Sequence, residues 1–274
     1  MTPGGEQQTA PERAVAAGEI AHAYGPRVHL LDNLLLRSAL ARVSSPDPRL
    51  TEVIGLVRCA YEHLLAAAAG ELASIEVALE TRMAPAHHRE GVFRGTILDP
   101  SAPVVVCDVI RAGLVPAQVC FERLLSVLPD EGVRLDHLNM SRVSDAQGRV
   151  SGVDLSGSKV GGSVEDAVLL IPDPMGATGS TVVRALEHYV NEHGTPRKVV
   201  CLPMIATPEF LRCVLDAFDE LVVYTARLDR GLSPPDVLAM PPGAEWEREC
   251  GLNEQGYIVP GAGGIGELLN NAWC

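Results

Sequence analysis

Two hydrophobic patterns alternate along most of the chain. Short apolar runs, typical of fully buried strands, occur at residues 102–110, 167–172, 198–206 and 220–228. Amphipathic helical spacing follows three of these runs, at residues 114–128, 182–190 and 207–218. Residues 133–142 alternate between apolar and polar positions as a further strand. Strands that alternate with helices predict an α/β fold with a doubly wound, mainly parallel sheet, and ligands of such sheets bind beyond the carboxyl ends of the strands.

The other segments are less regular. Residues 1–12 are polar and predict a disordered tail, and we expect residues 13–274 to form a single domain. Helical spacing predicts N-terminal helices at about 32–42 and 50–72. The pattern then predicts a strand at 75–83, an irregular connection at 84–100 and, where Ser, Gly and Asp dominate, a mobile excursion at 144–162.

The segment between the buried run at 167–172 and the following helix has the composition of an anion site. It reads Asp173, Pro174, Met175, Gly176, Ala177, Thr178, Gly179, Ser180, Thr181. The first N–H groups of a helix lack backbone partners and carry the positive end of the helix dipole, so they attract phosphate. Gly176 and Gly179 keep side chains away, and the hydroxyls add donors. An ordinary turn, with Ser180 or Thr181 as the helix N-cap, explains the same residues on local grounds.

Charged residues follow three of the predicted strands directly. Arg111, Arg142 and Asp173 occupy these positions, so a parallel sheet would bring them to one crevice. The alternative is that each arginine is solvated or paired with a surface carboxylate. The glycine-rich segment 251–274 is expected to be an ordered binding loop rather than a flexible tail, because Tyr257 to Pro260 give it an apolar anchor.

Composition excludes several classes of protein. The chain has 274 residues and is 47% hydrophobic, but its apolar runs are shorter than the ~18 residues of a membrane span. The first ten residues do not read as a leader, so the cytoplasm is the expected compartment. A formal charge of −13 argues against binding to nucleic acid or an anionic membrane. Seven cysteines without a C-x-x-C pair are expected to be reduced packing residues, and the adjacent His87 and His88 do not predict a metal site.

Four segments together resemble uracil phosphoribosyltransferases. They are IRAGL (110–114), the strand end at Arg142, IPDPMGATGST (171–181) and GLNEQGYIVPGAGGIG (251–266), and the similarity runs from about Leu30 to the C-terminus. The resemblance implies a type I phosphoribosyltransferase core, a hood over the base at about 229–274, and a homodimer or higher oligomer. It also implies the reaction of uracil with phosphoribosyl pyrophosphate (PRPP), which gives uridine monophosphate and pyrophosphate and uses Mg²⁺ bound mainly through PRPP.

The resemblance also assigns roles to residues of this sequence. Residues 173–181 would hold the ribose and its 5-phosphate, while Arg111 and Arg142 would bind pyrophosphate, for which the guanidinium fork is suited. The Arg111–Ala112 bond matches a position where the family often has a cis peptide. Lys159, on the mobile excursion, would close over pyrophosphate. The base pocket would be lined by Ile258 and by the backbone of Gly263, Gly264 and Ile265.

Three departures from the family pattern concern the base. The family motif G-L-G-D-A-G is Gly261 to Gly266 here, so that Gly264 replaces an aspartate and Ile265 a smaller alanine. An insertion at 232–250 contains four prolines, and its Trp246 is expected either to cover a base or a neighbouring subunit or to lie on a surface loop. A different heterocyclic acceptor therefore stays open, and so does a non-catalytic regulator that senses nucleotides.

Overall fold

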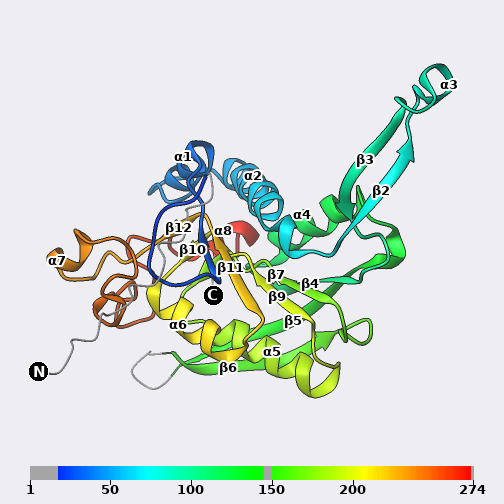
Figure 1. Cartoon of the computed structure of the whole chain (residues 1–274). Coiled ribbons are helices and arrows are strands. Elements are labelled where there is room, and N and C mark those ends of the chain that lie inside the picture. Colours follow the sequence, from blue (N-terminus) through cyan, green and yellow to red (C-terminus); the bar gives the residue numbers. More distant parts are fainter. Residues whose placement is uncertain (1–17, 145–149, 273–274) are drawn as a thin grey trace, which may run out of the picture.

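Seven strands form the central sheet of the computed structural model, which describes residues 18–144 and 150–272 (Figure 1). Their order across the sheet is β1 (Val28–Leu30), β11 (Leu221–Thr225), β9 (Lys198–Cys201), β7 (Val168–Ile171), β4 (Val104–Ile110), β5 (Val133–Ser144) and β6 (Val150–Lys159). All neighbours are parallel except β5 and β6. The predicted α/β fold with a doubly wound, mainly parallel sheet is confirmed. The tail predicted at 1–12 lies outside the described residues.

Helices cover both faces of the sheet (Figure 1). One layer contains α1 (Leu34–Val43), α2 (Leu50–Ala68), which continues as η1 (Ala69–Glu71), and α4 (Leu114–Leu125); the other contains α5 (Ser180–Glu192) and α6 (Pro208–Ala217). Side chains alternate between the layers as strand geometry requires: Val106 and Leu170 face the first layer, and Val105 and Leu169 the second. By length and composition α2 and η1 would suffice to span a membrane. However, Val57 and Leu64 of α2 are fully buried in the core.

Three very short strands form a separate sheet beyond the carboxyl edge of the central sheet. β8 (Met175–Gly176), β10 (Ile205–Ala206) and β12 (Arg227–Leu228) come shortly after β7, β9 and β11, and they pair with one another in parallel. The runs predicted as single strands at 198–206 and 220–228 are therefore each interrupted. This small second sheet is formed by the segments that follow β7, β9 and β11 at the carboxyl edge of the central sheet.

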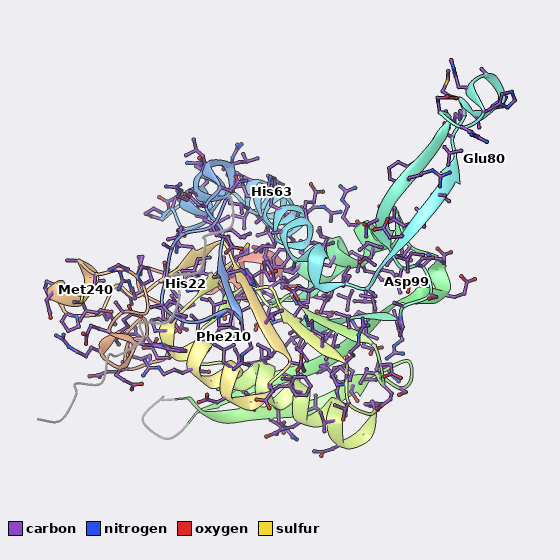
Figure 2. The ribbon with its side chains drawn as sticks, in the orientation of Figure 1. His22, His63, Glu80, Asp99, Phe210 and Met240 are labelled. Carbon is purple, nitrogen blue, oxygen red and sulfur yellow. The ribbon has the colours of Figure 1, made fainter. Side chains whose placement is uncertain are left out.

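Residues 84–100 do not form the irregular connection that was predicted from the sequence. β2 (Ser74–Glu80) pairs along its whole length with β3 (Val92–Leu98), and α3 (Ala84–His87) lies at the turn. The resulting hairpin projects from the body of the protein; Figure 2 labels Glu80 toward its tip and Asp99 at its root. Pro85, Gly91 and Gly95 suggested a loop, but only the breakers Pro85 and Gly91 lie in the turn.

The segment 144–162 is also more regular than predicted. Residues 150–159 form β6, which pairs antiparallel with β5, and residues 145–149 lie outside the described part. β4 ends opposite Asn139, whereas β5 continues to Ser144 because β6 gives it a partner. Arg142 consequently lies within β5, opposite Val153, and does not directly follow the strand.

The insertion at 232–250 folds around a buried carboxylate. It contains α7 (Pro235–Leu238) and η3 (Trp246–Arg248), and its ends meet where the Leu232 N–H donates to the Cys250 carbonyl at 3.0 Å. The buried Glu249 accepts from Arg230 at 2.7 Å and from the Tyr24 hydroxyl. Trp246 packs edge-on against Tyr24 and donates to the Pro208 carbonyl at 3.1 Å. Trp246 thus contacts Tyr24 and the first turn of α6 within its own chain.

Candidate active site

The segment 173–181 connects β7 to α5 and forms a loop whose back is packed against α6. Cβ atoms built on Gly176 and Gly179 would lie 3.0 Å from the Phe210 ring and 2.8 Å from the Cys213 Cβ. Gly179 also has a φ of 83°, which favours glycine. The Thr207 hydroxyl, in turn, donates to the Ala177 carbonyl at 2.6 Å. The loop is therefore held closely from behind, and larger residues do not fit at its glycines.

The front of this loop is the N-terminus of α5. Gly179 is the N-cap and has no side chain with which to cap the helix, while the Ser180 N–H contacts the Thr178 hydroxyl at 3.4 Å. The predicted alternative, an ordinary N-cap by Ser180 or Thr181, is therefore not what the structure has. The Thr178 and Ser180 hydroxyls contact each other at 2.8 Å beside the first turn. The first N–H groups of α5 and these two hydroxyls are suitable donors for a phosphate, so residues 173–181 are called the candidate phosphate loop, or phosphate loop for short.

Asp173 lies where β7 gives way to this loop. The Met175 N–H donates to its carboxylate at 3.4 Å. β7 and β4 are parallel neighbours, and Val106 pairs with Leu170, so the segments that follow them, with Asp173 and Arg111, leave the sheet at the same edge. Burial raises the pKa of the Tyr61 hydroxyl, and the nearby Asp173 charge raises it further. Asp173 therefore provides a half-buried negative charge at the edge of the phosphate loop.

The turn after β4 is tight and contacts the C-terminal segment. Its cis peptide joins Ile110 to Arg111, one residue earlier than the Arg111–Ala112 bond that was predicted. The Arg111 guanidinium donates to the Ala272 carbonyl at 3.3 Å, and Asn270 donates to the Arg111 carbonyl at 3.4 Å. The structure thus brings together two separately predicted motifs, the Arg111 turn and the glycine-rich tail.

Below this turn lies an unexpected pair, formed by a buried carboxylate and a histidine whose side chain is 41% exposed. The Asp108 carboxylate contacts His137 Nδ1 at 2.7 Å across the neighbouring strands β4 and β5. Its other oxygen, Oδ1, is buried and has no hydrogen-bond partner among the described residues. A Cβ built on Gly113 would be only 3.0 Å from that oxygen. Burial raises the pKa of Asp108, although the hydrogen bond from His137 opposes the shift.

The proposed base loop is anchored by two residues that the sequence analysis did not select. Arg227 binds Asp229 through Nε at 2.7 Å and through Nη2 at 2.8 Å. Asp229 accepts from the Gly261 N–H at 2.8 Å, while Arg227 donates to the Gly261 carbonyl at 2.9 Å. Arg227 begins β12 and Asp229 directly follows it, and charge after a strand is the same signal that drew attention to Arg111 and Asp173.

The remaining predicted base-loop residues divide into two groups. Ile258 and Ile265 are buried in the core layer with α2 and α4, so the branched side chain of Ile265 packs inward. Gly263 is exposed, and a Cβ built on it would meet nothing within 4 Å. Gly264 precedes the short helix α8 (Ile265–Asn270). The backbone of Gly263 is therefore exposed, and that of Gly264 is partly exposed beside it.

Lys159 is not brought to the phosphate loop. It ends β6 and lines a hollow of about 400 Å³ together with Glu192 and His193, at the C-terminal end of α5. The phosphate loop is at the opposite end of this helix, about 20 Å away for 13 residues. The side chain of Arg142 lies outside the described part of the structure. Arg111, Asp173 and the base loop therefore form the described part of the site.

The six cysteines among the described residues lie outside the loop 173–181 and the Arg111 turn. All six in the described residues are free thiols, as was predicted. Burial raises the pKa of Cys120 to about 12, and it also raises the pKa values of Cys107 and Cys201. Thiols held in this state are poor nucleophiles at neutral pH.

The chain is similar to known proteins both in sequence and in fold. A family model described as uracil phosphoribosyltransferase matches residues 55–243, more than half of the chain. A protein of that name from Thermococcus gammatolerans is 28% identical over 176 residues, which make up 64% of this chain and 64% of that protein. The aligned part therefore spans less than two thirds of that relative. Another, from Symbiobacterium thermophilum, is 28% identical over 243 residues, or 89% of this chain and 97% of that protein.

Among solved structures, the AQ2163 protein from Aquifex aeolicus has a similar fold. Its TM-score is 0.66 at 22% sequence identity, and the match covers 88% of this chain and 97% of that chain. Likeness at this identity concerns the fold alone. It supports the arrangement of strands and loops from which the crevice is built.

Proposed function

Because this chain belongs to the uracil phosphoribosyltransferase family, we propose that it transfers the phosphoribosyl group of PRPP to a pyrimidine base, with uracil as the first candidate. One observation is central to this proposal: the phosphate loop with Asp173 and the Arg111 turn follow the neighbouring parallel strands β7 and β4 at the same edge of the sheet. The Asp173 carboxylate would accept hydrogen bonds from the ribose hydroxyls. The N–H groups and hydroxyls of residues 174–181 would hold the 5-phosphate.

The chemistry needs stabilisation of charge rather than a covalent nucleophile. A base nitrogen forms the new bond to the anomeric carbon as the bond to pyrophosphate breaks, and the electron pair of that bond leaves with pyrophosphate. Arg111 would stabilise the negative charge that develops on the leaving group, with Arg142 as the second predicted contact. Positioning of both substrates in one dry crevice would supply much of the remaining rate enhancement.

Mg²⁺ fits this arrangement through oxygen ligands. Magnesium retains water and is usually bound by one or two carboxylates together with substrate phosphates. Asp173, beside the phosphate loop, is a carboxylate suited to such a role. When bound with PRPP, the ion would neutralise charge on the pyrophosphate. The described cluster of His188, Glu192 and His193 lies at the other end of α5 and is not adjacent to this loop.

The residues of the proposed site restrict the identity of the phosphoribosyl donor more than that of the acceptor base. The phosphate loop and the Arg111 turn recognise only the sugar phosphate and the leaving group, so they fit PRPP with any base. Gly264, in place of the family's aspartate, favours a second candidate, a phosphoribosyltransferase for another heterocycle. Discrimination between the two rests on the residues around Gly263 and Gly264.

We infer a homodimer from the projecting hairpin. An isolated two-stranded hairpin is marginally stable in water, and this one exposes apolar side chains: Ile75, Leu79, Met83 and Phe93 are 36%, 48%, 55% and 47% exposed. Leu79 and Phe93 are direct cross-strand neighbours. A second copy of the chain would cover this surface. The cytoplasm remains the compartment predicted for the enzyme.

Pyrophosphate release tests the proposed function directly. The protein is incubated with PRPP and Mg²⁺ and, separately, with uracil, cytosine, adenine, guanine and hypoxanthine. Turnover with uracil is the expected result. Turnover with only another base would replace uracil and retain PRPP as the donor. Saturable binding of PRPP without turnover on any base would contradict the enzymatic proposal and favour a nucleotide-sensing role.

A further inference from the structure

The carboxylate of Glu267 occupies the space beside Gly264. A Cβ built on Gly264 would lie 2.8 Å from the Glu267 carboxyl carbon and closer still to Oε2. Carbon and oxygen atoms do not approach so closely, so a side chain at position 264 and this position of Glu267 exclude each other. The Gly264 backbone has φ −80° and ψ 80°, outside the left-handed region, and a residue with a side chain could adopt it. The conflict is therefore with Glu267 and not with the backbone.

The helix α8 fixes the direction in which Glu267 points. Ile265 and Leu269 of α8 are buried in the core. Positions 264 and 267 are three residues apart, so they are neighbours on a different face of the helix. A Cβ on Gly266 would lie 3.5 Å from the Ala112 Cβ, so α8 rests on the turn that contains Arg111. Glu267 thus lies beside the Gly264 backbone, on a helix that rests on the Arg111 turn.

The side chain of Glu267 lacks a partner within the described part of the chain. No described residue donates a hydrogen bond to its carboxylate or forms an ion pair with it, although the residue is half-buried. The ends of other acidic side chains nearby are occupied; Asp229, for example, binds both Arg227 and the Gly261 N–H. A partly buried carboxylate without a donor is well placed to accept a hydrogen bond from a ligand.

We propose that Glu267 is a specificity-determining residue, which accepts a hydrogen bond from an N–H group of the acceptor base. It takes the place of the aspartate that the family has at position 264, and the small Gly264 makes room for it. The inference rests on the proposed function. It restricts the acceptor to heterocycles that present a ring N–H or an amino group to this carboxylate, and it disfavours bases that are methylated there.

Two substitutions remove the carboxylate from this position in different ways. Glu267→Ala deletes it, and Gly264→Ala displaces it while Glu267 stays in the chain. Both should raise the KM for uracil about tenfold or more, leave the dissociation constant for PRPP within twofold, and reduce the preference for uracil over 3-methyluracil. Glu254→Ala removes another carboxylate, an exposed one of the same C-terminal segment, and should change none of these values.

Moving the carboxylate from position 267 to position 264 gives the sharpest comparison. The double variant Gly264→Asp, Glu267→Ala places a carboxylate on the other position and should recover most of the lost affinity for the base. An unchanged KM in both single variants would overturn the inference, and so would weaker binding of PRPP with unchanged binding of the base. Should the wild type turn over no base at all, the proposed function fails by itself. In that case calorimetry measures the dissociation constant for uracil in the presence of PRPP. The same comparison of wild type and variants, with this constant in place of KM, then decides the role of Glu267.

Discussion

At the scale of single residues, Asp173 and Arg111 are placed for different parts of PRPP. Asp173→Asn should weaken PRPP binding about tenfold, because a neutral amide loses one of the charge-assisted hydrogen bonds of about 1.5–3 kcal/mol. Arg111→Ala should weaken binding by a similar factor through the pyrophosphate. Titration calorimetry with PRPP and Mg²⁺ measures both. Asp216→Asn on α6 and Arg37→Ala on α1 remove exposed charges elsewhere and serve as controls. Unchanged PRPP affinity in both site variants would disprove the site assignment.

A second residue-scale prediction concerns Asp108. Burial raises its pKa in the folded protein above the ordinary value of 3.8. The folded state therefore holds this proton more tightly than the unfolded chain, and stability is lost as the pH rises from about 4 through the folded-state pKa. Asp108→Asn keeps the shape and a hydrogen bond to His137 but cannot ionise. The free energy of unfolding in urea, measured from pH 4 to pH 7, should improve progressively for the variant relative to the wild type. A constant difference across this range would refute the prediction.

Single residues of the site were predicted correctly where the hydrophobic pattern gave the correct end of the strand that precedes them. Arg111 and Asp173 were selected correctly as residues at strand ends, because β4 and β7 are short buried runs with clear limits. Arg142 was placed after its strand, but β5 is prolonged by pairing with β6, which no local pattern reveals. Asp229 carried the same signal and was overlooked. Glu267 could not have been found, because its relation to Gly264 depends on how α8 packs.

At the scale of elements, Thr207 joins the phosphate loop to α6. Its hydroxyl accepts from the Phe210 N–H at 3.0 Å as the N-cap of α6 and donates to Ala177 at 2.6 Å. Thr207→Val keeps the volume but loses both bonds at a fully buried site. It should destabilise the protein by about 2 kcal/mol or more, since a cap alone is worth about 1 kcal/mol and a buried carbonyl is left unpaired.

The control for this prediction retains the hydroxyl. Thr207→Ser should recover most of the free energy of unfolding and most of the PRPP affinity. Thermal unfolding and calorimetry of the two variants separate the effect of the hydrogen bonds from that of the methyl group. Equal losses in Thr207→Ser and Thr207→Val would show that packing, and not the link to the loop, is decisive.

Elements with strong periodicity were predicted well, and those held by distant partners were not. The helix at Pro208–Ala217, with Thr207 as its cap and proline in its first turn, agrees with the sequence. The strand β3 was missed because VFRGTIL contains Gly95, and its strand character comes from pairing with β2. The insertion was expected to resist regular structure, yet Glu249 organises it through residues as far away as Tyr24. Such long-range contacts have no signature in a local window of sequence.

At the scale of the whole molecule, two additions extend the core in opposite directions. The hairpin of β2 and β3 projects at one end, and the insertion with α7 lies at the other (Figure 1). Figure 2 labels Met240 in the insertion, far from Glu80 of the hairpin. The insertion is tied to its own chain by the buried pair of Arg230 and Glu249. The hairpin, in contrast, presents its apolar side chains outward.

This difference leads to a prediction about assembly. Replacing the cross-strand neighbours Leu79 and Phe93 by lysine should convert a dimer into monomers, because each buried large apolar side chain contributes about 1.5–3 kcal/mol to association. Light scattering coupled to size-exclusion chromatography measures the mass over a range of concentrations. Both positions are exposed, so circular dichroism should show an intact fold. Met240→Lys is the matched control, since Met240 is 41% exposed but lies in the insertion. Dissociation caused by Met240→Lys and not by the hairpin variant would move the interface to the insertion, and a monomeric wild type would contradict a dimer altogether.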